Sequence, residues 1–468
     1  MAFPEILAIA MVAAMCAGLM AGYPVALTLG GVSLIFALAG DALGTFPLSL
    51  LIALPPRVYG VVTNEVLTAI PLFVFMGVML ERSRIAEDLL ETMGRLFGSF
   101  TGGLAIAVLV VGVLLAAAKG IVGATTVTMG LIVLPTMLRH GYNKRLAAGT
   151  VAATATLAQI FPPATVLVLL GDQMSNAWQA AQLAKGVFSP QAVTVSDLFA
   201  GAIVPAFGLV FLYLVFLVGV AAIWPKTSPA IPLEPNAPHG AALARRLAGA
   251  MVAPLLLIMA VLGSILAGIA TPSESASIGA VGAILLALFR ADVNRSWIGE
   301  ILLPVVQRTA QITSMIFLIL IGATLFSLVF RGFGGDDMVN RALTDLPGGV
   351  SGAVLVVMLA LFLLGFVMDA FEIIFVVVPI VAPILLKMPG VDPVWLGVMM
   401  AMNLQMSYLH PPLGPTLFYL RGVAPKEITT MDIYIGIIPF VLIQMLALVA
   451  LWFLPGLATW LPHRLYGG

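Results

Sequence analysis

Cysteine and histidine are nearly missing from this chain. Cys16 is the only cysteine, so a disulfide within the chain and a cysteine-rich metal site are both excluded. The four histidines do not form the His-Glu-x-x-His spacing of a zinc hydrolase, and no Gly-x-x-x-x-Gly-Lys-Ser/Thr loop is present to bind ATP phosphates. An intramembrane enzyme therefore remains an alternative function, but the sequence contains no such catalytic motif to support it. ATP hydrolysis through a phosphate-binding loop of this kind is excluded.

Charge is equally scarce. Only 9% of the 468 residues are charged, against roughly 25% in soluble domains. Basic and acidic residues cancel at 21 each, so no basic surface indicates a nucleic-acid partner. The chain is 61% hydrophobic with a mean hydropathy of +1.14, which predicts an all-α polytopic membrane protein with about 11–13 transmembrane segments. Its first span lacks the features of a cleaved signal peptide, so we expect it to be retained.

Two double prolines, Pro162-Pro163 and Pro411-Pro412, interrupt long apolar stretches in matching contexts. Proline removes a backbone donor and clashes with the preceding turn, so each pair breaks a helix. Within a membrane, non-helical backbone is tolerated only where it is buried in protein or lines a wet cavity. Paired breaks of this kind are typical of the binding site of a secondary transporter.

Two apolar segments, 101–137 and 350–386, are too long for one ordinary span, and each contains a helix breaker. We interpret both as re-entrant helical hairpins, with tips near 120–126 and 369–372. Basic residues are in excess on both flanks of the first hairpin, whereas the flanks of the second, the Asp336-Asp337 loop and Lys387–Asp392, have no basic excess. The positive-inside rule therefore places the two hairpins on opposite faces. The basic residues after the first hairpin are Arg139, Lys144 and Arg145. This arrangement predicts an inverted repeat.

Weak internal similarity supports the repeat. Residues 134–138 resemble 382–386, and Gly149 corresponds to Gly397 at the same offset. Later, 197–201 resembles 432–436, with a proline shortly after each. Similarity among apolar segments arises easily by chance, but three matches in the same order favour true internal symmetry.

These features predict five regions along the chain. They are N-terminal scaffold helices (1–65), a first repeat (66–223, with broken helix 146–172), a cytoplasmic linker (224–247), central scaffold helices (248–300) and a second repeat (301–468, with broken helix 393–420). The segment 173–196 has no counterpart in the second repeat; it is either a contact for an external partner or an idle loop. Whether 46–62 crosses the membrane or lies along its surface stays open.

The ordered motifs of the chain resemble those of one known family, the large membrane subunit of tripartite ATP-independent periplasmic (TRAP) transporters, or DctM-like family. The resemblance covers essentially the whole length. Its carriers are Ile70-Pro71-Leu72-Phe73, Gly123-Ala124-Thr125-Thr126, Phe161-Pro162-Pro163, Thr271-Pro272-Ser273-Glu274, Met368-Asp369, Gly390-Val391-Asp392-Pro393, Asn403-Leu404 and His410-Pro411-Pro412. Each motif is weak alone, but the set is specific.

The resemblance implies a sodium-driven, elevator-type importer in the bacterial inner membrane, where lipid surrounds it. Its expected partners are a small four-helix membrane subunit and a periplasmic binding protein that delivers a carboxylate; no cofactor is expected beyond sodium as coupling ion. Residues 371–374 and 417–425 resemble the branch associated with 2-oxo acids, other monocarboxylates and aromatic acids. A channel-like subunit without its own site is a further alternative, although a channel requires a continuous pore rather than opposed hairpins.

Helix breaks expose backbone carbonyls that suit sodium, and helix N-termini that suit a carboxylate. The candidate substrate and ion-binding residues therefore gather at the two hairpin tips and the two breaks. In the first repeat they are Lys119, Gly120, Gly123, Thr125, Thr126, Thr128, Pro162 and Pro163. In the second they are Asp369, Glu372, Asn403, Gln405, Ser407, Pro411 and Pro412. The resemblance implies sodium ligands among Asp369, Thr125, Thr126 and Asn403.

Each candidate also has a structural interpretation. Threonine in a membrane helix often bonds the carbonyl one turn earlier, and Asn or Gln often joins neighbouring helices. Asp369 is either a coupling carboxylate or a helix cap, and the two roles are compatible. Glu372 is either a second lining residue or the partner of a basic group.

Lys119 departs from the family, whose members usually carry a small or hydroxyl residue at this hairpin position. Its ammonium group either takes the place of one cation, or holds the substrate carboxylate, or extends to water along its apolar stem. If it replaces a cation, the sodium stoichiometry of the family does not apply to this chain.

Overall fold

The computed structural model describes residues 2–83, 92–94, 96–120, 122–231, 241–290 and 297–467; the side chains of 118, 119, 241–250 and 290 lie outside the described part. Within these ranges the chain forms helices and no strand, so the expected all-helical fold is confirmed. Seven of the described helices are long and apolar enough to cross a membrane, or eight if a bent pair is one span. Four shorter apolar helices accompany them.

One group of helices packs around the long helix α13. Its members are α1 (Phe3–Met20), α2 (Val25–Ala42), η1 (Leu48–Ala53), α3 (Leu54–Val62), α4 (Ala69–Arg82), α11 (Ala241–Leu266), α12 (Pro272–Arg290), α13 (Leu303–Gly332) and α14 (Gly335–Thr344). Helix α13 packs against α2 and α4, and α4 packs against α12. The segment 46–62 forms η1 and α3, neither of which buries a residue in the chain. We call this group the scaffold; besides the two predicted scaffold regions it includes α4, α13 and α14, which lie within the two predicted repeats.

The first predicted hairpin and broken helix are both present. Helices α6 (Gly103–Lys119) and α7 (Val122–Arg139) form the hairpin. The broken helix consists of α8 (Lys144–Thr156), η2 (Leu157–Gln159) and α9 (Thr165–Ala184), followed by α10 (Val195–Ile223). Because α9 continues to Ala184, most of the expected 173–196 insertion is helical, and only 185–194 connects α9 to α10.

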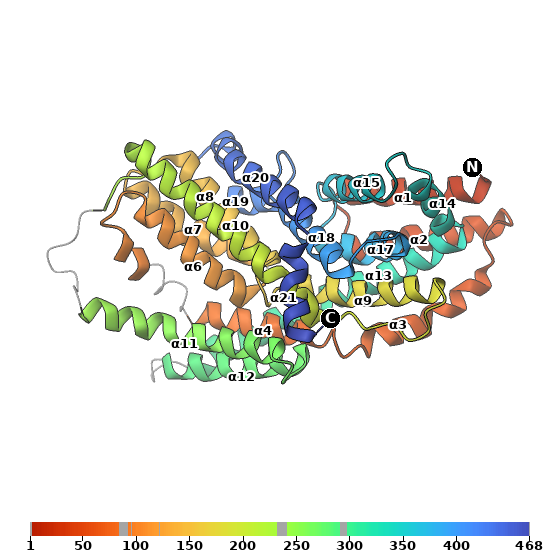
Figure 1. Cartoon of the computed structure of the whole chain (residues 1–468), viewed down its shortest axis with the longest axis horizontal. Coiled ribbons are helices and arrows are strands. Elements are labelled where there is room, and N and C mark those ends of the chain that lie inside the picture. Colours follow the sequence, from red (N-terminus) through yellow and green to blue (C-terminus); the bar gives the residue numbers. More distant parts are fainter. Residues whose placement is uncertain are drawn as a thin grey trace.

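The second repeat has the same order of elements. They are α15 (Gly349–Leu364), α16 (Ala370–Val376), α17 (Val378–Lys387), α18 (Pro393–Ser407), α19 (Pro415–Val423), α20 (Thr430–Phe453) and α21 (Gly456–Tyr466). Its hairpin is less regular, since α16 and α17 are bent by 56°. In Figure 1, α6 and α7 lie on the left of the molecule and α15 and α17 on the right, with α18 between them. We call the two hairpins, the broken helices, α10, α20 and α21 the transport group.

Glycines set the packing between the repeats. A Cβ atom on Gly149 of α8 would overlap the carbonyl oxygen of Gly436 in α20. A Cβ atom on Gly201 of α10 would overlap the side chain of Val394 in α18. The residues that matched in sequence therefore lie at two equivalent helix crossings, and each crossing joins a helix of one repeat to a helix of the other.

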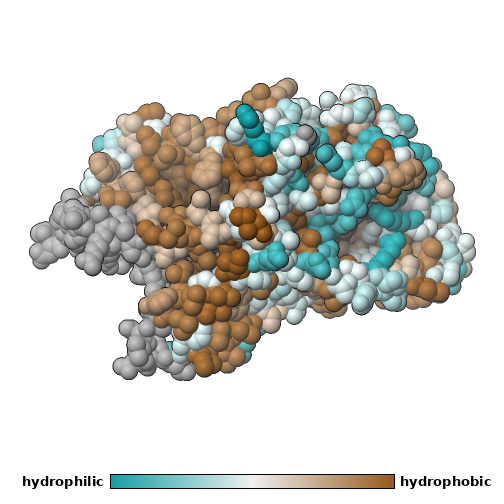
Figure 2. Space-filling model, turned by 60° about the horizontal axis from the view of Figure 1, so that its bottom comes forward, coloured by the Kyte–Doolittle hydropathy of each residue, from teal (hydrophilic) through white to brown (hydrophobic). Residues whose placement is uncertain are grey.

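The outer surface is largely apolar. In Figure 2, hydrophobic residues cover much of the left and lower parts of the molecule, and hydrophilic residues gather toward the right. Helix α12 contributes Ile278, Val281, Leu285, Leu288 and Phe289 to the exposed apolar residues. Large exposed apolar areas are costly in water and favourable against lipid or another membrane helix, as expected for a multi-pass membrane protein.

Candidate functional site

The tip of the first hairpin lies against the first break. Gly120 ends α6 with a left-handed φ of 61°, and a Cβ atom there would lie 3.0 Å from the Thr165 hydroxyl oxygen. Glycine reaches this conformation without the penalty that a side chain adds. Thr165 begins α9, separated from Pro162-Pro163 by Ala164 alone. The first hairpin therefore contacts the unwound segment, as the sequence predicted.

The tip of the second hairpin carries the two acidic candidates. The Ala370 N–H donates to Asp369 Oδ1 at 2.7 Å, and the Asp369 N–H donates to Glu372 Oε2 at 3.1 Å. Asp369 is therefore the N-cap of α16, and Glu372 completes the capping interaction while it is itself buried. Asp369 itself is half-buried.

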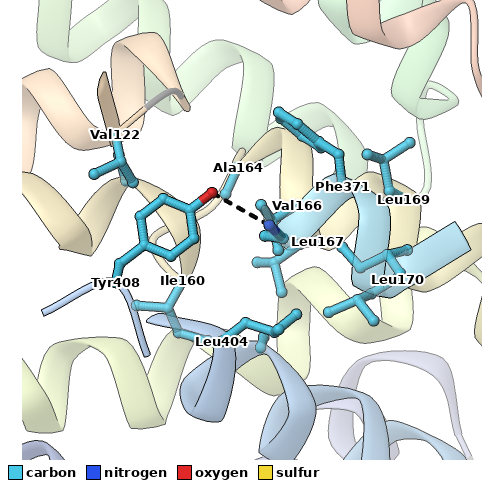
Figure 3. Packing of buried hydrophobic residues seen from close by; sticks show 14 of the residues in the cluster. Val122, Ile160, Ala164, Val166, Leu167, Leu169, Leu170, Phe371, Leu404 and Tyr408 are labelled. Atoms are coloured by element: carbon cyan, nitrogen blue, oxygen red, sulfur yellow. Dashed lines mark hydrogen bonds between the residues drawn. The ribbon is translucent and has the colours of Figure 1, made fainter. Parts of the chain in front are cut away.

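Tyr408 connects the second break to that tip. Its hydroxyl oxygen accepts a hydrogen bond of 3.3 Å from the Ala370 N–H, and in Figure 3 its ring extends from the α18 side across to α16. Val122 of the first hairpin and Ile160 of the first break lie around the same ring. The two hairpins and two breaks thus meet at one place.

A cavity of about 480 Å³ opens at this meeting point. The transport group lines it with Gly120, Val122, Gly123, Ala124, Val127, Thr128, Gln159, Val166, Asp369, Phe371, Tyr408 and Tyr419. The scaffold lines it with Gly77, Val78, Glu81, Arg82, Arg308, Gln311, Ile312 and Met315. Four of the predicted site residues therefore share the cavity wall, namely Gly120, Gly123, Thr128 and Asp369.

Several other candidates lie behind that wall. The Thr126 hydroxyl donates to the Val122 carbonyl at 2.8 Å, which is the bond to the carbonyl one turn earlier that threonine often makes in a membrane helix. The Asn403 amide donates to the Met358 carbonyl at 2.7 Å, and the Ser407 hydroxyl donates to the Leu404 carbonyl at 2.7 Å. None of the other candidates with described side chains lines the cavity: Thr125, Pro162, Pro163, Glu372, Gln405, Pro411 and Pro412. The Lys119 side chain lies outside the described residues.

Sequence reasoning missed the residues that the scaffold contributes. Arg82, Arg308 and Gln311 line the cavity together with Tyr408 and Tyr419. Arg82 ends α4 and Arg308 lies in the first half of α13, where a basic residue looks like an ordinary helix-end residue in a membrane protein. No local signal separates the two interpretations, because the cavity position depends on packing between distant helices.

Buried polar atoms without a partner mark both breaks. Among the described residues, Gln159 Oε1 and Thr165 Oγ1 at the first break have no hydrogen bond. At the second break the same holds for both amide atoms of Gln405 and for Thr416 Oγ1. Leaving a buried polar group unsatisfied costs about 1–3 kcal/mol, so such groups are rare in native proteins. Five such atoms lie on the two sides of the two breaks, and seven others lie elsewhere in the described part of the chain. The breaks are therefore among several places where a buried polar atom has no partner within the protein.

Nearly the whole chain matches a known family. The profile of the tripartite ATP-independent periplasmic transporter DctM component matches residues 11–457. The chain belongs to the DctM family. It is thus the large permease subunit of a secondary transporter in the inner membrane, in a family that also uses a small membrane subunit and a periplasmic binding protein. The resemblance found in the sequence is confirmed.

Relatives in the family span different cargoes. The chain is 27% identical to the C4-dicarboxylate TRAP transporter large permease of Vibrio cholerae, over 98% of this chain and 99% of that protein. It is 24% identical to the ectoine TRAP transporter large permease of Halomonas elongata, over 96% and 98% of the two chains. The YdaH transporter of Alcanivorax borkumensis has a similar fold, with a TM-score of 0.63 and 14% identity over 98% of this chain and all of that chain.

Proposed function

We propose that this DctM-family subunit imports a carboxylate through an elevator movement driven by a sodium gradient, with the cargo delivered by a periplasmic binding protein. The observation that carries the proposal is the set of unpartnered polar atoms at the two broken helices, which face two opposed hairpins. A small four-helix membrane subunit completes the assembly.

The cation part rests on oxygen atoms. Gln159, Gln405, Thr165 and Thr416 all supply side-chain oxygens at the breaks, where the proline pairs also leave backbone carbonyls without helical partners. Asp369 supplies the only carboxylate that the transport group contributes to the described cavity wall. Sodium, as a hard cation, suits such a set of neutral oxygens and one negative charge.

The carboxylate part rests on the opposite wall of the cavity. Arg82 and Arg308 come from the scaffold, and their guanidinium groups suit a carboxylate. Phe371, Tyr408 and Tyr419 bring three aromatic rings to the transport-group side. This combination favours one carboxylate attached to a flat or apolar body, such as a 2-oxo acid or an aromatic acid, over a compact dicarboxylate.

The elevator part rests on a second cavity between the same two groups. It has a volume of about 510 Å³ and is lined by Arg57, Asn64, Asp172, Arg331 and Pro379 among others. Arg308 and Arg331 lie toward opposite ends of α13, so the two cavities open at opposite ends of the scaffold–transport interface. Two contacts cross the interface at the second cavity: Asn64 donates to Asp172 at 2.9 Å, and Arg331 donates to the Pro379 carbonyl at 3.3 Å. These contacts would break when the transport group moves along α13.

The small membrane subunit has indirect support from one relative. The isethionate relative of Oleidesulfovibrio alaskensis is named permease protein DctMQ, and this chain covers 94% of its own length but 64% of that protein. A longer relative of this kind supports a second membrane component in the transporter. The exposed apolar face of α12 offers such a component a membrane-embedded contact surface.

Uptake by reconstituted proteoliposomes tests the function directly. We expect accumulation of a labelled carboxylate only when the small subunit, the binding protein and an inward sodium gradient are all present. Replacing the sodium gradient by potassium is the matched control. Equal uptake without the binding protein, or without sodium, would show that the proposal is wrong.

Replacing Gln405 by leucine tests the cation site by two opposing effects. Removing a buried amide that lacks partners should raise the stability of the sodium-free protein by about 1 kcal/mol or more. The same change should weaken sodium binding about tenfold, because an oxygen ligand is lost. The measurement is thermal unfolding with and without sodium. Asn403→Leu is the control, since the Asn403 amide already donates to the Met358 carbonyl. Losing this hydrogen bond should destabilise the protein equally with and without sodium. Unchanged sodium dependence in Gln405→Leu would contradict the assignment.

A further inference from the structure

A cavity of about 420 Å³ lies outside the candidate site, where the starts of α10 and α18 meet α21. Its wall contains the carboxylates of Asp197 and Asp392, the rings of Trp178 and Tyr466, and His463. The Trp178 N–H donates to the Gln191 carbonyl at 2.9 Å, which holds that ring in place. The cavity therefore combines two acidic groups with two aromatic faces.

The internal repeat provides a second helix start of the same kind, at the start of α20. We call each of these two sites, at Asp197 and at Asp432, a corner. There Asp432 Oδ2 accepts from the Thr429 N–H at 3.0 Å and from its hydroxyl at 2.7 Å. Its other oxygen, Oδ1, accepts from Arg145 Nε at 3.4 Å. The two carboxylate oxygens of Asp432 thus have different partners: Oδ2 caps the helix and Oδ1 binds the guanidinium group.

At the start of α10 only the capping interaction is present. Asp197 Oδ2 accepts from the Thr194 N–H at 2.8 Å and from its hydroxyl at 2.7 Å, as in the other corner. None of the described residues donates a hydrogen bond to Asp197 Oδ1. The residue that contacts Gly436 at the first crossing is Arg145, whereas the one that contacts Gly201 at the second is Val394. Val394 lines the cavity, so the space that corresponds to the arginine side chain is open.

The cavity and Arg145 lie at opposite ends of α10. The end of α10 is joined to the start of α8, because the Asn143 N–H donates to the Thr227 carbonyl at 2.9 Å just after α10. The positive-inside rule places that end, with Lys144 and Arg145, in the cytoplasm. The cavity at the start of α10 is therefore on the outer face, beside the 185–194 connection.

We propose that this cavity receives an arginine or lysine side chain from the periplasmic binding protein and so contributes to docking. The inference rests on the proposed function for the identity of that partner. The entering cation takes the position that Arg145 takes in the other corner. Asp197 Oδ1 and the second oxygen of Asp392, whose Oδ1 caps α18, accept its hydrogen bonds, and the aromatic rings contact its charge.

The substitution Val394→Arg tests the proposal, because it supplies the missing guanidinium from within the chain. We expect the half-saturating concentration of the binding protein in the uptake assay to rise at least about tenfold, since interfacial charge pairs carry about 1.5 kcal/mol or more. Arg145→Val is the matched control at the other corner and should leave that concentration unchanged. Asp197→Asn is the second variant, for the case that Val394→Arg folds poorly. It keeps an acceptor for Thr194 but removes the charge, so it should also raise the half-saturating concentration of the binding protein.

A small probe tests the cavity without any partner protein. N-acetyl-arginine amide should give saturation-transfer NMR signals with the wild-type protein in nanodiscs, and N-acetyl-glutamine amide should not. Val394→Arg should abolish the signal and Arg145→Val should keep it. Equal signals from wild type and Val394→Arg, or no wild-type signal, would overturn the proposal. If no binding protein stimulates wild-type uptake, the proposed function fails, and the probe still decides whether the cavity accepts a guanidinium.

Discussion

Replacing Asp369 by asparagine is expected to reduce sodium-driven uptake by about 100-fold or more. The proposed sodium ion would lose the only carboxylate that the described residues of the transport group contribute to the cavity wall. A 100-fold loss corresponds to about 2.8 kcal/mol of binding free energy. Asparagine is as good an N-cap as aspartate, so α16 should keep its start. The measurement is sodium-dependent uptake in proteoliposomes, together with the sodium-induced shift in thermal unfolding.

The control for this experiment is Asp392→Asn, which removes the charge of another N-cap that lies away from the candidate site. That variant should keep its sodium-induced shift in thermal unfolding. Wild-type uptake by the Asp369→Asn protein would show that Asp369 is only a cap. Loss of the folded protein would instead show that its carboxylate is required by the hairpin, and sodium-free unfolding measures this separately.

Replacing Gly436 by alanine is expected to disrupt the packing between the repeats. The added Cβ atom would overlap the backbone of Arg145 at the start of α8, and backbone atoms cannot move aside as a flexible side chain does. Overpacking of this kind costs about 1–3 kcal/mol, and more where helices must separate. We expect a large drop in the yield of folded protein and in its thermal stability in detergent.

Gly208→Ala provides the comparison, since nothing lies within 4 Å of a Cβ atom at that position of α10. Alanine favours a helix over glycine by about 1 kcal/mol, so this variant should be at least as stable as the wild type. If Gly436→Ala were equally stable, the close crossing of α8 and α20 would be wrong. The same test applies to Gly149→Ala on the facing helix.

Residues differ in how well the sequence alone predicts their position and partners. The proline pairs, both hairpins and Asp369 at a tip were placed correctly, because each depends on a property of its own segment. Asn403 and Gln405 look alike in sequence, yet Asn403 donates to Met358 and Gln405 has no partner among the described residues. Sequence cannot distinguish them, because the partner is a carbonyl on another helix.

The cavity wall shows the same limit. Tyr419 lies over Gly123, where a Cβ atom would come within 3.1 Å of the ring, although the two residues belong to different repeats. Arg308 reaches the cavity from the scaffold. Such residues become neighbours only after the repeats interlock, and their positions follow from helix packing rather than from any local pattern.

Composition and local motifs were enough to predict an all-helical membrane transporter of the DctM family with two hairpins and two broken helices. Local chemistry suffices for that, since apolar length specifies a span and a proline pair specifies a break. The packed helices were needed to show which polar atoms at the breaks lack partners and which scaffold residues line the cavity. They were also needed to show that no described arginine bonds to Asp197 as Arg145 bonds to Asp432. These are properties of contacts between helices, and a contact exists only after both helices have packed.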